Sequence, residues 1–276
     1  MITISAFGDE IGPELKLQME FCDSHGIRCI DIRGIDGINV SKMTVSQALA
    51  YHRQLDDRGF RVPCLGSPLG KIRLDEDFDA HLDMAKHCCD IAEAFGTDAI
   101  RMFSFYAPRG QNIADHRGVV MDRLAAMVHV AEAGGKVLYH ENEKGIYGDV
   151  PDRIKDIFAT IRSPRLKFLY DPGNLTVEDV APYEGGWKKG LDAMTEFFHI
   201  KDKVLGEYTF VPAGEGQGQF PEIFRDLHAR NWSGYMTLEP HMKAAGQYAG
   251  FSGPQMFSRA VAGLKRLLDQ AGIQYQ

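Results

Sequence analysis

The segment VLYHE (residues 137–141) has the pattern of a short β-strand that ends on an ionisable side chain, and three later segments repeat it. These are KFLYD (167–171), FFH (197–199) and YMTLE (235–239), so the four segments end on Glu141, Asp171, His199 and Glu239. The four residues are 30, 28 and 40 positions apart, about one strand and one helix in each case. This spacing predicts neighbouring strands of a parallel sheet, whose carboxyl ends meet at one edge.

Strand and helix patterns alternate along the whole chain. We expect strands at residues 2–7, 27–33, 61–65, 99–103, 137–141, 167–171, 197–199 and 235–239. Helices are expected at residues 13–25, 44–58, 77–95, 113–133, 151–161, 178–195, 221–230 and 254–270, the sixth interrupted by two glycines. Eight strands alternating with eight helices predict an α/β fold of the (β/α)8 TIM barrel type.

Because no linker or change of composition divides the chain, we expect a single domain over residues 1–276. The alternative architecture is an open, doubly wound sheet. Such a sheet would carry a glycine-rich fingerprint after its first strand, and FGDEIG (residues 7–12) is not one. The pattern therefore favours the barrel.

Composition excludes several classes of partner. With 31 basic and 38 acidic residues the net charge is -7, and no basic run offers a surface for nucleic acid. No segment approaches the roughly 18 apolar residues of a membrane span. The five cysteines form an odd set without CxxC spacing, and the first residues do not resemble a signal peptide. We therefore expect a cytoplasmic protein whose ligand is a small molecule.

Strand periodicity predicts that the four ionisable residues share one layer inside the barrel. Residues two apart lie on the same face of a strand, as Leu169 does with Asp171 and Phe197 with His199. Three carboxylates so placed would repel one another, and the carboxylates and the imidazole would all lose hydration. A divalent cation bound between them would offset both costs. Oxygen donors without a thiolate favour manganese, with magnesium, cobalt or zinc as alternatives. The alternative interpretation is that each of the four residues only ends its own strand at the protein surface and binds no metal.

The chain resembles the xylose-isomerase-like barrels, a family of sugar epimerases and isomerases of the tagatose-3-epimerase and hydroxypyruvate-isomerase type that also includes inosose dehydratases. The resemblance covers essentially the whole chain and rests on HEN at Glu141, YDPGN at Asp171, HIKD at His199, GEG at Glu215 and LEPH at Glu239. It implies a TIM barrel, a metal site, a sugar or sugar derivative as substrate, and a homo-oligomer, either dimer or tetramer. The chain departs from the family at Asn174, where many of the epimerases carry a histidine.

The predicted chemistry is proton transfer next to a carbonyl through a metal-bound cis-enediolate. Glu141 and Glu239 would form the acid/base pair of an isomerase or epimerase that acts on a keto-sugar or polyol. A lyase on the same scaffold is the alternative, either an inosose-type dehydratase or an enzyme that cleaves 3-keto-glycosides, like a C-glycoside deglycosidase. A third possibility is a catalytically silent barrel that serves as a partner subunit.

Six further polar residues are candidates for substrate binding: Lys71, Arg101, Asn174, Lys201, Glu215 and His241. Lys201 shares a strand face with His199 and could neutralise a developing oxyanion, or be a solvated lysine. Arg101 could bind hydroxyls or pair with Glu141. His241 could line the pocket or lie in an exposed loop. Glu215 lies in a glycine-rich loop, residues 214–218, whose backbone N–H groups could bind a hydroxyl or phosphate.

Overall fold

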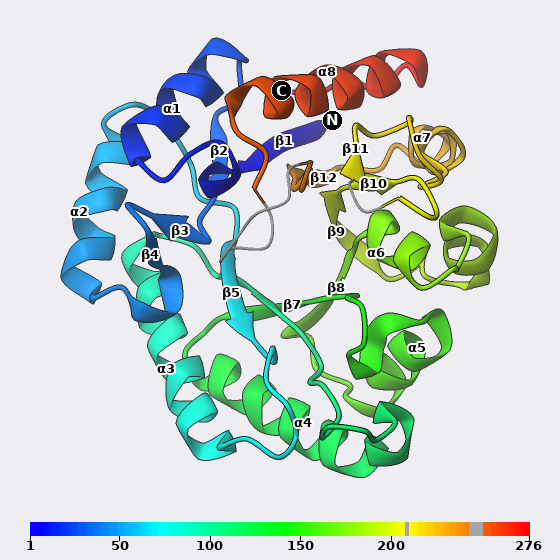
Figure 1. The fold of residues 1–276 in the computed structure, drawn as a ribbon. Helices are drawn as coiled ribbons and strands as arrows, with labels where there is room; N and C mark the ends of the chain where they lie inside the picture. The colour runs from blue at the N-terminus through cyan, green and yellow to red at the C-terminus, as the bar shows by residue number, and fades with distance from the viewer. Residues whose placement is uncertain (208–209, 243–250) are drawn as a thin grey trace.

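Eight parallel strands form the central sheet of the protein, seen in Figure 1. The structure is a computed structural model that describes residues 1–207, 210–242 and 251–276. Along the sheet the order is β2-β1-β12-β9-β8-β7-β6-β5. The strands are β1 (Ile2–Phe7), β2 (Cys29–Asp31), β5 (Leu65–Leu69), β6 (Ala99–Met102), β7 (Val137–Glu141), β8 (Leu166–Tyr170), β9 (Thr195–Ile200) and β12 (Gly234–Leu238).

The sheet is nearly closed into a barrel. Its two open edges, at β2 and β5, are joined by isolated parallel bridges: Cys29 of β2 pairs with Arg61, which precedes β5, and Ile32, which follows β2, pairs with Leu65 of β5. Helices cover the outside of the ring (Figure 1). They are α1 (Leu15–Ser24), α2 (Val45–Asp56), α3 (Phe78–Ala94), α4 (Arg117–Ala133), α5 (Pro151–Thr160), α6 (Pro172–Val177), α7 (Phe220–Ala229) and α8 (Pro254–Gln270). The predicted single-domain (β/α)8 barrel is confirmed.

Apolar side chains pack on both faces of the strands. A large cluster fills the space between the sheet and the helices, with Phe168 and Phe198 among its fully buried members. A small separate cluster contains Cys64, Leu169 and Phe197, with Tyr139 and Tyr235 packed against it. Leu169 and Phe197 are the residues predicted to share a strand face with the polar strand ends, so this small cluster lies beneath them.

Two predicted elements differ from the structure. The helix expected at 178–195 is wrong, because this segment contains only a π-helical turn (Pro182–Gly186) and a 3-10 turn (Trp187–Lys189). Glycines at 185 and 186 weaken a helix, and Gly190 adopts φ 104°, a left-handed value that ends the turn. The helix that follows β8 is α6 instead, which begins at Pro172.

The third strand also lies further along the chain than predicted. The segment expected to be a strand at 61–65 pairs with β2 only through isolated bridges, and regular strand β5 runs from Leu65 to Leu69. Pro68 within it has no N–H to donate, and the register with β6 shifts between Leu65 and Leu69. The sequence predicts no strand beyond residue 65, because glycine and proline, as at Gly66 and Pro68, usually interrupt a strand.

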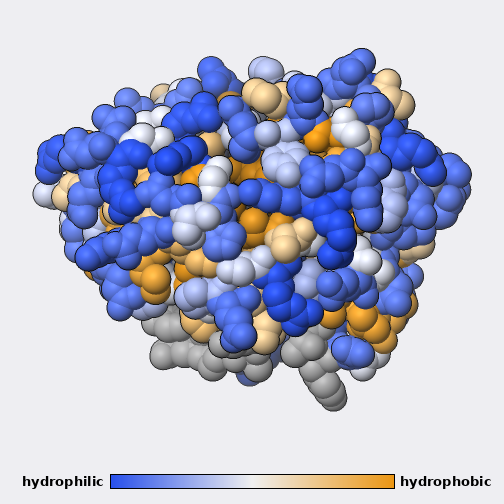
Figure 2. Space-filling model, turned by 90° about the horizontal axis from the view of Figure 1, so that it is seen from above, coloured by the Kyte–Doolittle hydropathy of each residue, from blue (hydrophilic) through white to orange (hydrophobic). Residues whose placement is uncertain are grey.

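The two chain ends lie side by side next to β1 (Figure 1). The backbone N–H of Ile2 donates to the carbonyl of Gln274, and that of Gln276 donates to the carbonyl of Ile2. Figure 2 shows one side of the molecule, which is largely hydrophilic with small hydrophobic areas between polar side chains. Within the described residues no helix is both long and apolar enough to cross a bilayer. All five cysteines are free and buried.

Candidate active site

The four predicted strand-end residues meet at the carboxyl ends of β7, β8, β9 and β12. These strands are direct neighbours in the sheet, and the register places Glu141 beside Leu169 and Thr237 beside His199. One ligand atom from each of Glu141, Asp171, His199 and Glu239 lies within 4.8 Å of all the others, and all four residues are buried. We call these four residues the acidic cluster.

The acidic cluster contains buried polar atoms that lack hydrogen bonds. His199 Nδ1 lies 3.2 Å from Glu141 Oε1 and 3.2 Å from Glu239 Oε2. Among the described residues, neither ring nitrogen of His199 nor Oδ2 of Asp171 makes a well-aligned hydrogen bond, although charged groups lie near Nδ1 and near Oδ2, and Nε2 of His199 has no partner of either kind. Burying such atoms without partners is unfavourable, and a divalent cation among them would satisfy their lone pairs. The residues therefore fit a divalent metal ion.

Asp171 is positioned by the turn that starts α6. Its Oδ1 accepts the backbone N–H of Asn174 at 2.9 Å, which caps the helix, and its Oδ2 is left toward the cluster. The side chain of Asn142 fixes the backbone of residue 171 from both sides, with hydrogen bonds of 2.9 Å to its N–H and its carbonyl. Asn174 also donates to Glu141 Oε1 at 3.2 Å, so its amide orients a cluster carboxylate.

Three cations surround the carboxylates of the cluster. Arg101 reaches Glu141 at 3.3 Å and Glu239 at 3.2 Å, which confirms the pairing alternative for this residue. Lys201 lies 3.0 Å from Asp171 and 3.3 Å from Glu239, and it is buried rather than solvated. Arg33, two residues after β2, lies 3.1 Å from Glu239. The negative charges of the cluster carboxylates are thus offset by the positive charges of these three side chains.

Opposing charges set the pKa values of the cluster. Burial raises the pKa of Glu141, but the charges of His199 and Arg101 reverse this and lower it to about 2. Burial lowers the pKa of His199, whereas Glu141 and Glu239 raise it to about 9. The pKa of Asp171 rises to about 7, mainly through burial, although Lys201 opposes the rise. A bound cation would favour ionised carboxylates and a neutral imidazole in this environment.

A cavity of about 340 Å³ opens beside the acidic cluster, and we call it the site cavity. Five of the six predicted substrate-binding residues line it together with Glu239: Lys71, Arg101, Asn174, Lys201 and His241. The side chain of Lys71 is about one-third exposed and pairs with Glu143 at 2.9 Å. His241 lies 3.1 Å from Glu10 and 3.5 Å from Glu239, so it faces the pocket rather than an exposed loop.

Among the six predicted substrate-binding residues, Glu215 is the one that does not line the site cavity. Its carboxylate faces Arg259 at 3.4 Å and Arg266 at 3.9 Å on α8. The expectation that the glycine-rich loop offers free N–H groups is wrong, because the N–H groups of Gly214, Gly216 and Gly218 donate to the buried carboxylate of Asp202. That carboxylate already satisfies the donors that a hydroxyl or phosphate would need.

Several residues of the site were not identified in the sequence. Arg33 is the last residue of the expected strand at 27–33, so the strand-end rule that found the cluster applies to it as well. Glu10 lies three residues beyond β1 and is fully buried behind His241. The sequence gives no comparable signal for Phe210, whose ring centroid lies 5.7 Å from that of His241. It approaches the site from β11 (Phe210–Val211), which pairs with β10 (Asp202–Lys203) in a two-stranded sheet.

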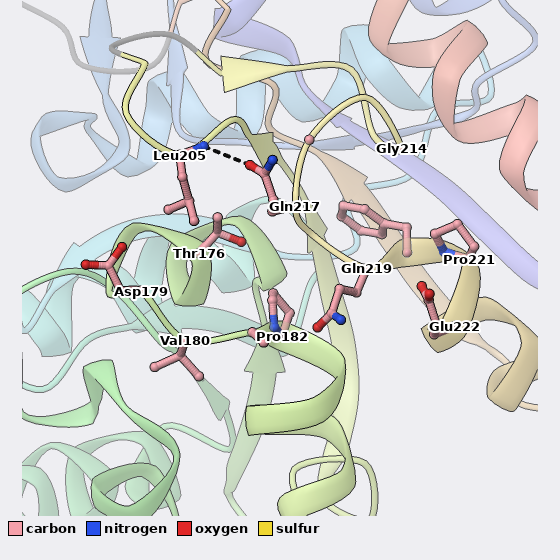
Figure 3. A pocket seen from close by; sticks show the side chains of 13 residues that line it. Thr176, Asp179, Val180, Pro182, Leu205, Gly214, Gln217, Gln219, Pro221 and Glu222 are labelled. Atoms are coloured by element: carbon pink, nitrogen blue, oxygen red, sulfur yellow. Dashed lines mark hydrogen bonds between the residues drawn. The ribbon is translucent and has the colours of Figure 1, made fainter.

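A second, larger cavity of about 510 Å³ lies beside α6 (Figure 3). Thr176 and Pro182 line it on one side, and Leu205, Gln217 and Gln219 from the segment before α7 line it on the other. None of the four cluster residues lines this cavity. Its larger volume therefore does not make it the better candidate for the chemistry of the cluster.

A nearly closed TIM barrel with a buried Glu/Asp/His/Glu metal-site cluster at its strand ends defines a class of metal-dependent barrel enzymes. The chain belongs to the xylose isomerase-like TIM barrel family, whose model matches residues 19–272. This confirms the family predicted from the sequence. No protein of curated function shows significant sequence similarity to the chain.

Solved structures with the same fold include enzymes of different activities. One is the probable 3-DHS dehydratase AsbF of Bacillus anthracis, with a TM-score of 0.74, 15% identity, and coverage of 95% of this chain and 98% of that one. Another is the 3-keto-D-glucoside 4-epimerase YcjR of E. coli, with a TM-score of 0.72, 15% identity, and coverage of 97% and 98%. A third is a xylose isomerase-like TIM barrel protein of Mycobacterium smegmatis in complex with magnesium, with a TM-score of 0.72, 17% identity, and coverage of 98% and 97%. At these identities the likeness shows the fold alone.

Proposed function

We propose that the protein is a divalent-metal-dependent isomerase or epimerase of a keto-sugar or related polyol. Glu141, Asp171, His199 and Glu239 would hold the metal ion, and Glu141 and Glu239 would also serve as the acid/base pair. The observation that carries the proposal is the buried convergence of four ligand atoms within 4.8 Å at the edge of the site cavity. The magnesium complex and the epimerase among the structures of the same fold support it.

A bound divalent cation would supply Lewis-acid polarisation of a substrate carbonyl, which makes a proton on the adjacent carbon easier to remove. The donor set suits manganese best, with magnesium, cobalt or zinc as alternatives. Hydrogen bonds within the protein hold the candidate metal ligands in place: Asn142 fixes the backbone of Asp171, and Asn174 donates to Glu141. Such surrounding hydrogen bonds keep ligands oriented before the substrate arrives.

The two glutamates are suited to proton transfer by their placement. They lie on β7 and after β12, each 3.2 Å from His199 Nδ1, and Arg101 contacts both. Glu239 lines the site cavity and would take up the proton from the carbon, and Glu141, in its protonated form, would deliver a proton of its own to the substrate. Each transfer contributes about 10²–10⁴-fold to the rate. Return to the opposite face of the same carbon is epimerisation, and return to the neighbouring carbon is isomerisation.

The surrounding cations would then stabilise the negative charge that develops on substrate oxygen. Lys201 is 2% exposed and its pKa is held well above its usual value, because Asp171 and Glu239 outweigh the opposing effect of burial. It therefore stays charged at neutral pH. A fixed cation in a buried site acts strongly on a developing oxyanion, since little solvent screens it.

A lyase on the same scaffold is the second candidate. Proton removal would be the same, but a leaving group on the next carbon would then be expelled, as in a dehydratase or an enzyme that cleaves 3-keto-glycosides. Asn174 favours this alternative, because its amide is committed to Glu141 and to the carbonyl of Asn142. It cannot act as the histidine found in many epimerases would. A silent partner barrel is disfavoured because both glutamates are present.

The direct test combines metal analysis with an activity panel. We expect the purified protein to contain a divalent metal and to act on ketoses or keto-glycosides when assayed with manganese, magnesium or cobalt. Incorporation of solvent deuterium next to the carbonyl would establish proton removal. The product then distinguishes an isomer or epimer from a dehydrated or cleaved molecule. A metal-free protein inactive on the whole panel would refute the proposal.

A matched pair of variants tests the acid/base assignment. Glu239→Gln should keep the fold and most of the metal but lower kcat by roughly 10³-fold, because the amide cannot take the proton. Glu215→Gln makes the same chemical change at a partly exposed glutamate outside the site cavity and should keep near-normal activity. Near-normal turnover of Glu239→Gln would contradict its role. The homo-oligomer and the cytoplasmic location remain predictions.

A further inference from the structure

The turn at the end of β5 forms one wall of the site cavity. Gly66, Pro68 and Lys71 of this segment all line the cavity. The backbone N–H of Lys71 donates to the carbonyl of Pro68 at 2.9 Å, which closes a tight turn. Gly70, inside the turn, has a φ of 83°, the left-handed value that such a turn needs. The place of Lys71 at the cavity therefore depends on the backbone of Gly70.

The two backbone polar groups of Gly70 have partners outside the turn. Its carbonyl accepts the N–H of Phe105 at 3.0 Å. Its N–H donates to Nε2 of His81, a residue of α3, at 2.7 Å. Gly70 and His81 are both buried. Because a buried N–H without an acceptor is unfavourable, the side chain of His81 fixes this part of the turn.

This hydrogen bond requires one protonation state of the imidazole. A backbone amide can only donate, so Nε2 of His81 must offer a lone pair, and the proton of the neutral ring must be on Nδ1. A second proton, on Nε2, would point an N–H at the N–H of Gly70. The bond between the turn and α3 therefore exists only while His81 is neutral.

The surroundings of His81 favour the neutral ring. Burial and the positive charge of Arg123, on α4, lower the pKa of His81, whereas Glu76, just before α3, opposes them. On its own helix, Asp77 uses its side chain to accept the N–H of Ala80. Because the pKa is lower in the folded protein than the usual 6.5, the stability that neutral His81 contributes is present above pH 6.5 and is lost as the pH falls below it.

We propose that His81 is a positioning residue for this wall of the site cavity, and that its protonation releases the turn that carries Lys71. When Nε2 takes up a proton from solvent, the N–H of Gly70 loses its acceptor. Lys71 then loses its fixed place, where Nζ lies 4.2 Å from the ring centroid of Phe103 and 2.9 Å from Glu143. Any effect on turnover rests on the proposed function, but the change in the turn does not.

Hydrogen exchange of the full-length protein tests the proposal without a substrate. Protection of peptides that contain residues 70 and 71 is measured at about pH 8 and about pH 5, on either side of the usual histidine pKa, and is compared with unstructured peptides. In the wild-type protein we expect protection to fall at least about tenfold at the lower pH, because the N–H of Gly70 has lost its acceptor. Protection that is equal at both pH values would overturn the proposal.

Two substitutions of His81 separate the hydrogen bond from the proton. His81→Gln places an amide oxygen near the position of Nε2, so the turn keeps an acceptor that does not titrate, and the pH effect should shrink to within about threefold. His81→Leu removes the acceptor, so protection should be low at both pH values. A similar fall of protection in the wild type and in His81→Gln would overturn the role of the imidazole.

A control and a metal measurement complete the design. His129→Gln makes the same chemical change at an exposed histidine of α4 and should keep the wild-type pH effect. Metal binding also weakens at low pH, but the wild type and His81→Gln share this change, so their difference isolates His81. If His81→Leu fails to fold, these two proteins still decide. A protein that binds no metal would refute the proposed function and leave the exchange result standing.

Discussion

Asp202 organises the loop that covers one side of the site, and replacing it gives a sharp prediction. Its carboxylate is fully buried and accepts four backbone N–H groups. Oδ1 accepts from Lys203 and Gly218, both at 2.8 Å, and Oδ2 accepts from Gly214 at 2.8 Å and Gly216 at 3.0 Å. In the described part of the segment between β9 and α7, this one side chain therefore holds four backbone N–H groups in place.

The substitution Asp202→Asn has a cost that follows from this geometry. The amide keeps one acceptor oxygen, but its nitrogen would face the two N–H groups that the other oxygen now accepts. Each buried N–H left without an acceptor costs about 1–3 kcal/mol, so the variant should lose about 2–6 kcal/mol of folding free energy. Local opening of the loop would limit the loss to the lower end of that range.

Denaturant unfolding and hydrogen exchange measure the two parts of this prediction. We expect a lower free energy of unfolding and faster amide exchange in residues 210–219, with unchanged metal content, because the acidic cluster lies at the ends of β7, β8, β9 and β12. Activity should fall about tenfold, since Phe210 lines the site cavity from this segment.

Asp152→Asn, at a side chain that is 94% exposed, is the control and should change stability by less than about 0.5 kcal/mol. A change below about 1 kcal/mol with protected amides would refute the reasoning.

Three further predictions concern stability. Gly70→Ala should cost at least about 2 kcal/mol in urea unfolding, because φ is 83° and an added Cβ would lie 2.0 Å from the carbonyl oxygen of Phe103; a cost within error would contradict this. Asp31 lies between the hydroxyls of Ser5 and Thr237, and burial raises its pKa from 3.8 to about 6. The folded protein therefore holds the proton of Asp31 more tightly than the unfolded chain does. The stability that this proton contributes is fully present below pH 3.8 and is lost as the pH rises through 6. Asp31→Asn should therefore flatten this pH dependence, worth up to roughly 3 kcal/mol between pH 4 and 8. Chelation of the metal should lower Tm by roughly 5–10 °C in a thermal scan, and an unchanged Tm would mean that no ion stabilises the fold.

The sequence predicts most of this architecture because strand and helix patterns alternate with little interruption. The strand-end rule also placed Glu141, Asp171, His199 and Glu239 together, since residues at the carboxyl ends of adjacent parallel strands must meet. It predicted the barrel layer beneath them as well, because side chains alternate between the faces of a strand. These inferences depend on local pattern, which the sequence displays directly.

The errors arise where contacts distant in the chain decide the structure. Glu215 has the same local surroundings in the sequence whether it faces a substrate or the arginines of α8, and only folding determines which. The glycine-rich segment appeared free to bind a ligand because nothing in its own sequence shows that Asp202 would take its N–H groups. Likewise, a proline such as Pro68 usually argues against a strand. The sequence does not show that the pairing of β5 with β6 is irregular between Leu65 and Leu69, which allows a proline there.

The acidic cluster draws its ligands from four adjacent strands, β7, β8, β9 and β12, whereas Arg33 and Arg101 come from the opposite arc, at β2 and β6. This division separates two kinds of change. Substitution of Arg33 or Arg101 alters the charge around Glu239, which both residues contact, but leaves the four candidate ligand atoms on their own strands.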